Sequence, residues 1–467
     1  MKLFARPKCL TEAIAPVITL DRLTGLRIFE YPRGQPRPIL SLFYLLFLYC
    51  LYCSGTWYLV QEYYSIVKLL KLEYFLYKLV SNYIIVAIII VKLLLGWWYT
   101  KKFEACCNKI NKIDETLRQL GSTINYDRIN FIIIGALITF FTISTFLSIV
   151  VFIIMRPHTN VYKIIGCIMT YTYELIVNFT VIFEFSIFVI CLQMQFDLVN
   201  QLLHKHSVLS GKVKLGIFEM QDYAKIINVE QQRLFPKKIL SKRSQSGKKM
   251  ASRKNISVLE KQNSVKSNFP SQFQNNLRNR SQKHNSVMTE CQERKYLLQI
   301  IKQVHLELCK VSKMVCVIFG VPTACEIGVI IASFTTTVCI LYIRYIIQQH
   351  KITDSLWQQT FVMTILSVIY ILRIIILSRV CKHTVDKGNK TIEIIYSIYE
   401  CDKESGVQEE IQQFGIQILQ SPVRFSVHGI SLDNHVLIMM LKTITTYLVI
   451  MIQVSNSLES NKDIQNI

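Results

Sequence analysis

The chain has 467 residues, of which 51% are apolar or aromatic and 18% are charged, and its mean hydropathy is positive, at +0.33. Soluble domains carry about 25% charged residues, and here the apolar residues gather in long blocks that basic segments separate. This distribution excludes a soluble enzyme, a secreted disulfide scaffold and a nucleic-acid-binding protein as first interpretations, although the net charge is +22.

Seven apolar blocks are long enough to cross a bilayer as helices. A membrane-spanning helix needs about 20 mostly apolar residues, and segments of lower hydropathy separate the blocks. In chain order we expect spans at residues 39–60, 76–99, 129–155, 162–194, 314–346, 360–378 and 436–454. The sequence therefore predicts an all-α membrane protein with seven transmembrane helices.

The distribution of lysine and arginine predicts which way the chain crosses the membrane. Cytoplasmic loops carry an excess of these residues. One set of connections, which includes the amino-terminal segment, holds 41 of them, whereas the connections on the other side hold 6. The ratio is still 19 to 6 without the long 195–312 segment. We therefore expect a cytoplasmic amino terminus and an extracellular carboxyl terminus.

This topology divides the chain into seven parts. They are a cytoplasmic segment (1–38), helices one to four (39–194), a basic loop (195–313), helices five and six (314–378), a second cytoplasmic segment (379–435), the last helix (436–454) and an extracellular tail (455–467).

The basic loop is expected to be cytoplasmic and largely disordered. Residues 241–286 are mostly Ser, Lys, Arg, Gln and Asn, a composition that cannot bury enough apolar surface to order itself. A solvated linker near anionic membrane lipids is the simpler interpretation, and a phosphorylated regulatory segment is the alternative. Interleaved aromatic residues are absent from its basic stretch, so we expect no nucleic-acid partner.

Charged residues inside the predicted spans indicate either function or buried ion pairs. Glu174 is the strongest functional candidate among them. Glu184 and Glu326 lie nearer the cytoplasmic half, where each could pair with Arg373 or Lys92.

The predicted spans also carry aromatic and polar residues that suit a small polar ligand. Such a pocket combines apolar walls with a few placed hydrogen-bonding groups. For each candidate the alternative is packing between helices. The candidates are Glu174, Tyr171, Tyr173, Asn178, Tyr83, Thr337, Tyr342 and Tyr370.

The last span carries a polar stripe. Lys442, Thr446, Ile450 and Gln453 follow one another at intervals of 4, 4 and 3 residues, so they share one face of a helix. Such a face could line an aqueous pore if several copies surround a symmetry axis. The alternative is that these groups bond to neighbouring helices and conduct nothing.

The same span resembles the insect gustatory receptor family. Thr446-Tyr447, five apolar residues and Gln453 are similar to that family's Thr-Tyr-(five hydrophobic)-Gln-Phe signature. The preceding Phe425 to Gly429 stretch is similar to its Phe-x-x-x-Gly lead-in. The 111–117 segment resembles the fructose-receptor branch.

The resemblance implies a ligand-gated, non-selective cation channel subunit in the plasma membrane of chemosensory neurons. A small tastant, either a sugar or a bitter compound, would open it, and the subunits would form a homotetramer or a heterotetramer. In this family the last helices of four subunits surround the pore. We expect no cofactor and no metal. Val454 stands where the family has Phe. The pore and gate residues implied are Gln453, Val454, Thr446, Tyr447 and Ile450.

Two other membrane classes stay open as alternatives. A receptor coupled to G proteins would have an extracellular amino terminus, and the chain lacks an Asp-Arg-Tyr after span three and an Asn-Pro-x-x-Tyr in span seven. A secondary transporter predicts inverted repeats and broken helices, for which Pro322 is one candidate break. The sequence shows no phosphate loop or nucleophile motif, so an enzyme is not expected.

Overall fold

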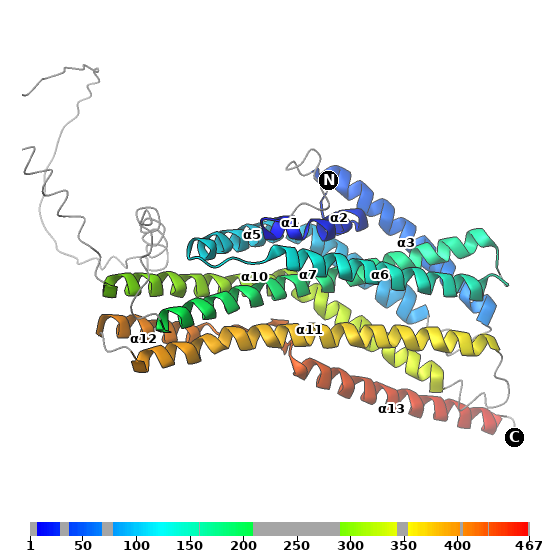
Figure 1. Ribbon diagram of the computed structural model, residues 1–467. Helices are drawn as coiled ribbons and strands as arrows, with labels where there is room; N and C mark the ends of the chain where they lie inside the picture. The colour runs from blue at the N-terminus through cyan, green and yellow to red at the C-terminus, as the bar shows by residue number, and fades with distance from the viewer. Residues whose placement is uncertain are drawn as a thin grey trace, which may run out of the picture. The chain divides into compact units, whose positions relative to one another are not determined.

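The computed structural model describes residues 7–28, 37–67, 78–157, 159–208, 290–342, 354–401, 405–427 and 429–465. Helices dominate these ranges, and one short hairpin precedes the last helix (Figure 1). The elements are α1 Leu10–Ala13, α2 Ala15–Thr24, α3 Pro38–Val67, η1 Leu79–Ile85 (a π-helix), α5 Val86–Gln119, α6 Tyr126–Met155, α7 Val161–Val208, α10 Glu290–Tyr342, α11 Asp354–Cys401, α12 Ser405–Gln420, β1 Ser426–Val427, β2 Ile430–Ser431 and α13 Asn434–Gln465.

The chain forms two units, of which one contains the helices described below. That unit joins Met1–Ser207 with Arg294–Ile467, and the second unit, Val208–Glu293, lies almost entirely outside the described residues. The predicted disorder of the basic loop concerns mainly residues 209–289, which the structure does not describe.

Within the described residues, each predicted span falls on a helix. Five helical stretches are long and apolar enough to cross a membrane. The other two predicted spans lie on α11 and on α13, whose apolar part, Asn434–Ile450, is shorter. The chain is therefore an all-helical membrane protein with several spanning helices. The five stretches are Pro38–Gln61, Tyr83–Gln119, Tyr126–Met155, Val161–Lys205 and Arg294–Tyr342.

Several helices continue beyond the expected spans. α7 reaches Val208 and α10 begins at Glu290, so both ends of the predicted 195–313 loop are helical. α13 reaches Gln465, within the segment for which the sequence predicts an extracellular tail. The segments 195–208 and 455–465 contain no Pro or Gly, so no residue in them breaks the helix. Hydropathy marks the apolar part of a helix, and these helices continue past the residues that hydropathy predicts.

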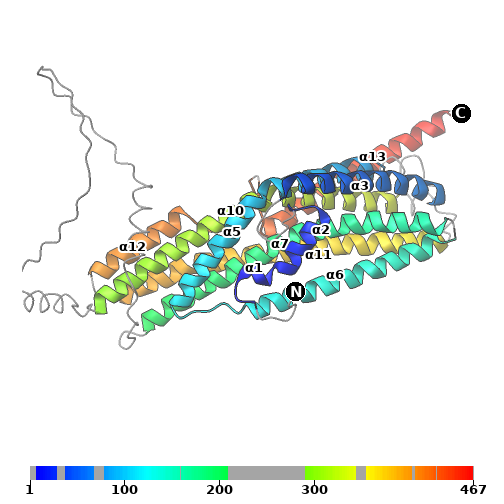
Figure 2. The ribbon, with the colours of Figure 1, turned by 90° about the horizontal axis from the view of Figure 1, so that it is seen from above.

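The core is centred on α7. Of its most apolar window, 78% is buried, compared with 56% for α10 and 17–22% for the other three candidate spans. Polar contacts join α7 to α11, which runs beside it (Figure 2). Asn200 accepts from the Thr391 hydroxyl at 2.7 Å and donates to the Lys387 carbonyl at 2.9 Å. Polar side chains on α7 are therefore enclosed by protein.

The hairpin sets the start of α13. β1 and β2 pair antiparallel, and Gly429 between them has a φ of 84°, which favours glycine. Phe425, Val427 and Leu432 are buried and anchor the hairpin in the core. The Asp433 carboxylate accepts the His435 backbone N–H at 2.7 Å and so caps the first turn of α13.

Candidate functional site

A buried ionic network joins four helices. The Lys92 ammonium on α5 is 1% exposed, donates to Asn178 Oδ1 on α7 at 2.6 Å, and forms an ion pair with Glu326 on α10. Arg373 Nη1 on α11 lies 3.7 Å from Glu326 Oε1. The expectation that Glu326 pairs with Arg373 or Lys92 is confirmed, because both cations face it.

Three of the predicted ligand residues surround this network. The Tyr52 hydroxyl on α3 donates to Glu174 Oε2 at 3.5 Å, and its ring centroid lies 5.4 Å from that of Tyr173. Arg373 Cζ lies 5.6 Å from the centroid of the Tyr370 ring. Together with Asn178, these side chains form one polar layer between the helices. The sequence does not single out Tyr52, because span one also contains Tyr44, Tyr49 and Tyr58.

The remaining ligand candidates have other surroundings. Tyr83 is 57% exposed, and the Thr337 hydroxyl donates to the Ser333 carbonyl within its own helix. Tyr171 is half-buried on α7, one turn before Glu174, and Tyr342 is the last residue of α10. The ligand-binding role of these four residues remains a prediction.

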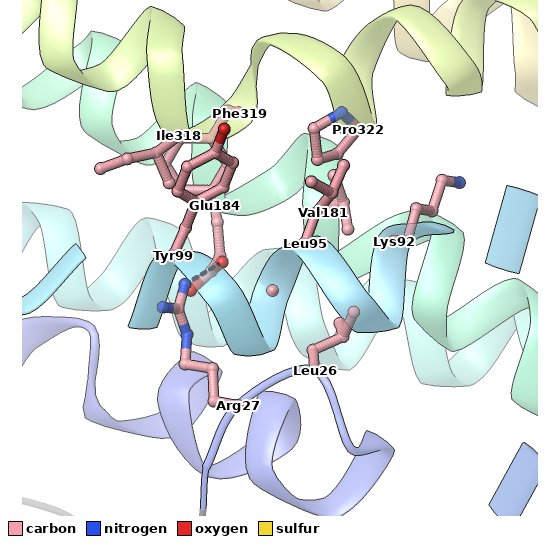
Figure 3. Close-up of a pocket in the computed structure, with 11 residues that line it drawn as sticks. Leu26, Arg27, Lys92, Leu95, Tyr99, Val181, Glu184, Ile318, Phe319 and Pro322 are labelled. Carbon is pink, nitrogen blue, oxygen red and sulfur yellow. Dashed lines mark hydrogen bonds and ion pairs between the residues drawn. The ribbon is translucent and has the colours of Figure 1, made fainter. Parts of the chain in front are cut away.

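A second buried network ties the amino-terminal segment to α7 (Figure 3). Arg27 Nη2 donates to Glu184 Oε2 at 2.6 Å, and Arg27 Nε donates to Asp21 Oδ2 at 2.6 Å. The expectation that Glu184 pairs with Arg373 or Lys92 is therefore wrong. The segment after α2 turns at Gly25, which has a φ of 81°, and this turn brings Arg27 to the bundle.

A small cavity lies between the two networks. Its volume of about 30 Å³ corresponds to about two water-sized spheres. Pro322 carries no backbone N–H, so the Ile318 carbonyl, four residues earlier, lacks its helical donor. The cavity lining is mainly apolar, and Arg27, Lys92 and Glu184 are its charged members. Its lining is Leu26, Arg27, Lys92, Leu95, Gly96, Tyr99, Val181, Glu184, Ile318, Phe319 and Pro322 (Figure 3).

The last helix has two different faces. Val436, Met440 and Ile444 are buried, on the helix that packs against α11. Their spacing of four residues places them on one face. The polar stripe lies on a different face, centred about 120° away around the helix, and each of its four members is exposed in the single chain. The stripe consists of Lys442, Thr446, Ile450 and Gln453.

The other implied pore residues flank this stripe. Tyr447 is 53% exposed, and the Thr446 hydroxyl donates to the Lys442 carbonyl at 2.9 Å, within the helix. Val454 belongs to α13, but its side chain lies outside the described part of the structure.

The fold is similar to that of a solved receptor. The structure of the insect olfactory receptor OR5 from Machilis hrabei in complex with eugenol matches with a TM-score of 0.57, covering 95% of this chain and 98% of that one. The structure of the same receptor reported without mention of a ligand matches with a TM-score of 0.59. Both share 11% sequence identity with this chain, so they show the fold alone.

Sequence comparison identifies the family. A curated relative, "Putative gustatory receptor 28b" from Drosophila melanogaster, is 26% identical over 95 residues, which is 20% of this chain and 20% of the relative. The match thus spans about a fifth of that protein's length. The sequence model of the family described as 7tm Chemosensory receptor matches residues 22–217 and 270–456. The chain therefore belongs to the 7tm chemosensory receptor family, as its resemblance to insect gustatory receptors predicts.

Proposed function

We propose that this receptor is a subunit of a ligand-gated, non-selective cation channel in the plasma membrane of chemosensory neurons. Four subunits, identical or mixed, surround one pore, and a small tastant opens it. The amino terminus is cytoplasmic, and α11 and α13 complete the seven spans. Gln453 and Val454 form the gate, and Thr446, Tyr447 and Ile450 lie along the path.

The two faces of α13 are the observation that carries this proposal. Polar groups in a membrane usually face protein or water. In the single chain, the face with Lys442, Thr446 and Gln453 points away from the face that is buried against α11. A symmetric assembly would give this stripe a common aqueous path.

The polar layer around Glu174 supports a ligand site for a small polar tastant. A carboxylate, an amide and aromatic rings can bind hydroxyl groups and stack on sugar or bitter-compound rings. A ligand that binds the open state more tightly shifts the equilibrium towards that state, by as much as its differential affinity.

Cysteine accessibility tests the pore assignment. Thr446→Cys and Ile444→Cys lie two residues apart, one on the exposed stripe and the other on the buried face. In cells expressing the chain alone, a charged methanethiosulfonate reagent is expected to change the current of Thr446→Cys. The Ile444→Cys variant should respond as the wild type does. Equal responses of the two variants would contradict the assignment.

Antibody staining of a tagged chain tests its orientation in the membrane. An epitope tag at the amino terminus should be stained only after the cells are permeabilised, because we expect this terminus in the cytoplasm. Staining on intact cells would overturn the topology and favour the alternative of a receptor coupled to G proteins.

A further inference from the structure

We infer that Arg27 of the amino-terminal segment is a positioning residue for the pore helix. It acts through a chain of buried aromatic side chains that leads to Phe425, at the start of the hairpin before α13. The gating consequence rests on the proposed channel function, whereas the physical coupling does not.

The Arg27 guanidinium is held on three sides. It donates to Asp21 Oδ2 and to Glu184 Oε2, each at 2.6 Å. Its Cζ lies 3.3 Å from the centroid of the Phe103 ring on α5. A guanidinium is planar and can serve two carboxylates while it stacks on a ring. The position of the Phe103 ring is thereby linked to α2 and α7.

The amino-terminal segment is itself tied to the bundle. The Tyr44 hydroxyl on α3 donates to the Leu23 carbonyl at 2.7 Å, and the Tyr173 hydroxyl on α7 donates to the Thr24 carbonyl at 3.0 Å. A Cβ atom on Gly96 of α5 would collide with the Leu26 carbonyl, so the two backbones are in close contact. The backbone that carries Arg27 is therefore held in place by the bundle.

From Phe103 the aromatic contacts lead towards the hairpin. The ring centroids lie 6.3 Å apart between Phe103 and Phe319, 5.8 Å between Phe319 and Phe185, and 6.3 Å between Phe185 and Phe425. Phe188 adds a parallel contact, at 5.2 Å from Phe103 and 5.6 Å from Phe319. All five rings are buried. Buried rings in contact transmit a displacement to one another, because protein interiors are close-packed.

Phe425 connects the aromatic contacts to the start of α13 through the hairpin. Its carbonyl accepts the Leu432 backbone N–H at 2.9 Å, which closes the hairpin. Asp433 follows directly and caps the first turn of α13. A change at Phe103 thus reaches the base of the proposed pore helix through packed side chains and one hairpin, a contiguous route of the kind that carries coupling.

Hydrogen–deuterium exchange of the purified full chain tests the coupling without any current. Arg27→Met keeps a long side chain but removes the charge and the donors. We expect faster exchange in residues 425–440 as well as in 21–27, by about 2-fold to 30-fold, the range found for coupling through packed networks. Arg118→Met, in an exposed ion pair on the same helix as Phe103, serves as the control. A change confined to residues 21–27, α5 and α7 would overturn the inference.

A second variant, Phe103→Leu, tests the same route independently, so that the inference can be decided even if Arg27→Met does not fold. Phe103→Leu leaves both ion pairs of Arg27 in place and removes only the ring. It should also speed exchange in residues 425–440, and Arg27→Lys should give an intermediate effect, because a lysine keeps the charge but not the planar stack. If Phe103→Leu leaves residues 425–440 unchanged while the protein stays folded, the aromatic route is contradicted.

Recordings of the steady current without added tastant separate this inference from the channel proposal. If the wild-type chain conducts, Phe103→Leu should alter the fraction of time that the channel is open. A current identical to the wild type would overturn the gating role and leave the channel standing. If the wild-type chain does not conduct alone, a channel of four identical subunits is excluded, and the exchange experiment alone decides the coupling.

Discussion

The Lys92 ammonium and the Asn178 amide oxygen lie 2.6 Å apart, and both side chains are almost completely enclosed. Asn178 belongs to the most buried of the candidate spans, and Lys92 reaches it from α5 while it pairs with Glu326. Burying a charge is costly unless a partner compensates it. Lys92 therefore links α5 to α7 through Asn178 and to α10 through Glu326.

Removing the Lys92 charge should destabilise the protein strongly. Lys92→Met leaves Glu326 buried with only Arg373, at 3.7 Å, as a partner. Breaking a buried pair on one side costs about 3–5 kcal/mol. We expect a marked fall in the thermal unfolding temperature of the purified receptor, and Lys92→Met/Glu326→Gln should recover part of it.

Lys310→Met is the matched control for this experiment. Lys310 pairs with Glu307 at 2.6 Å on α10, but both side chains are partly exposed. Such pairs contribute about 0–1 kcal/mol. Equal effects of the Lys92 and Lys310 substitutions would contradict the burial argument.

The contact between α10 and α12 should weaken in acid. Glu410 on α12 accepts from Gln299 Nε2 and from Lys302 Nζ, each at 2.7 Å. Burial acts to raise the pKa of the Glu410 carboxyl, but the hydrogen bonds and the Lys302 charge outweigh it and lower this pKa. Because the folded pKa is depressed, the stabilisation is present above the unfolded value and is lost as the pH falls through the folded value.

Exchange of α12 amides at different pH values measures this effect. After correction for intrinsic rates, protection of residues 405–420 should be constant from pH 7 to about pH 5 and should decrease below the ordinary glutamate pKa of about 4.3. The loss should be about 1 kcal/mol or less, because the pair is partly exposed. Glu410→Gln should flatten the profile, and an identical profile in this variant would refute the assignment.

Gly429 should be intolerant of a side chain for backbone reasons alone. Its φ of 84° is left-handed, and a Cβ atom at this position would meet no heavy atom within 4 Å. Gly429→Ala should therefore cost about 1–2 kcal/mol of unfolding free energy. Gly328→Ala, in α10 with equally open surroundings and no positive φ, should be neutral or stabilising. Thermal unfolding of both variants measures the difference, and equal shifts would contradict the turn argument.

Much of the helical layout can be predicted from the sequence, because apolar blocks are a local signal. Each of the seven blocks falls on a helix within the described residues. The pairing of Glu326 can also be predicted, since the spans contain few cations. Hydropathy does not report how far a helix extends beyond the lipid, so it does not predict the long ends of α7 and α10.

The tertiary contacts of the amino-terminal segment cannot be predicted in the same way. Arg27 and Glu184 are separated by 157 positions in the chain. Leu10, Ile14 and Val17 follow one another at helical intervals and are buried, but such a pattern does not identify the helix that the segment contacts. The Phe-x-x-x-Gly pattern before α13 identifies Phe425 and Gly429 by resemblance. Only the packing of Phe185 against Phe425 shows why the phenylalanine is needed there.

Single-channel recording tests most directly whether four α13 helices wall one ion path. The purified chain, reconstituted alone in a planar bilayer, should conduct cations. Gln453→Ala, on the exposed stripe, should change the unitary conductance or the closing of the pore, whereas Ile444→Val, on the buried face, should keep the wild-type conductance. A Gln453→Ala channel with unaltered conductance and closing would contradict the arrangement.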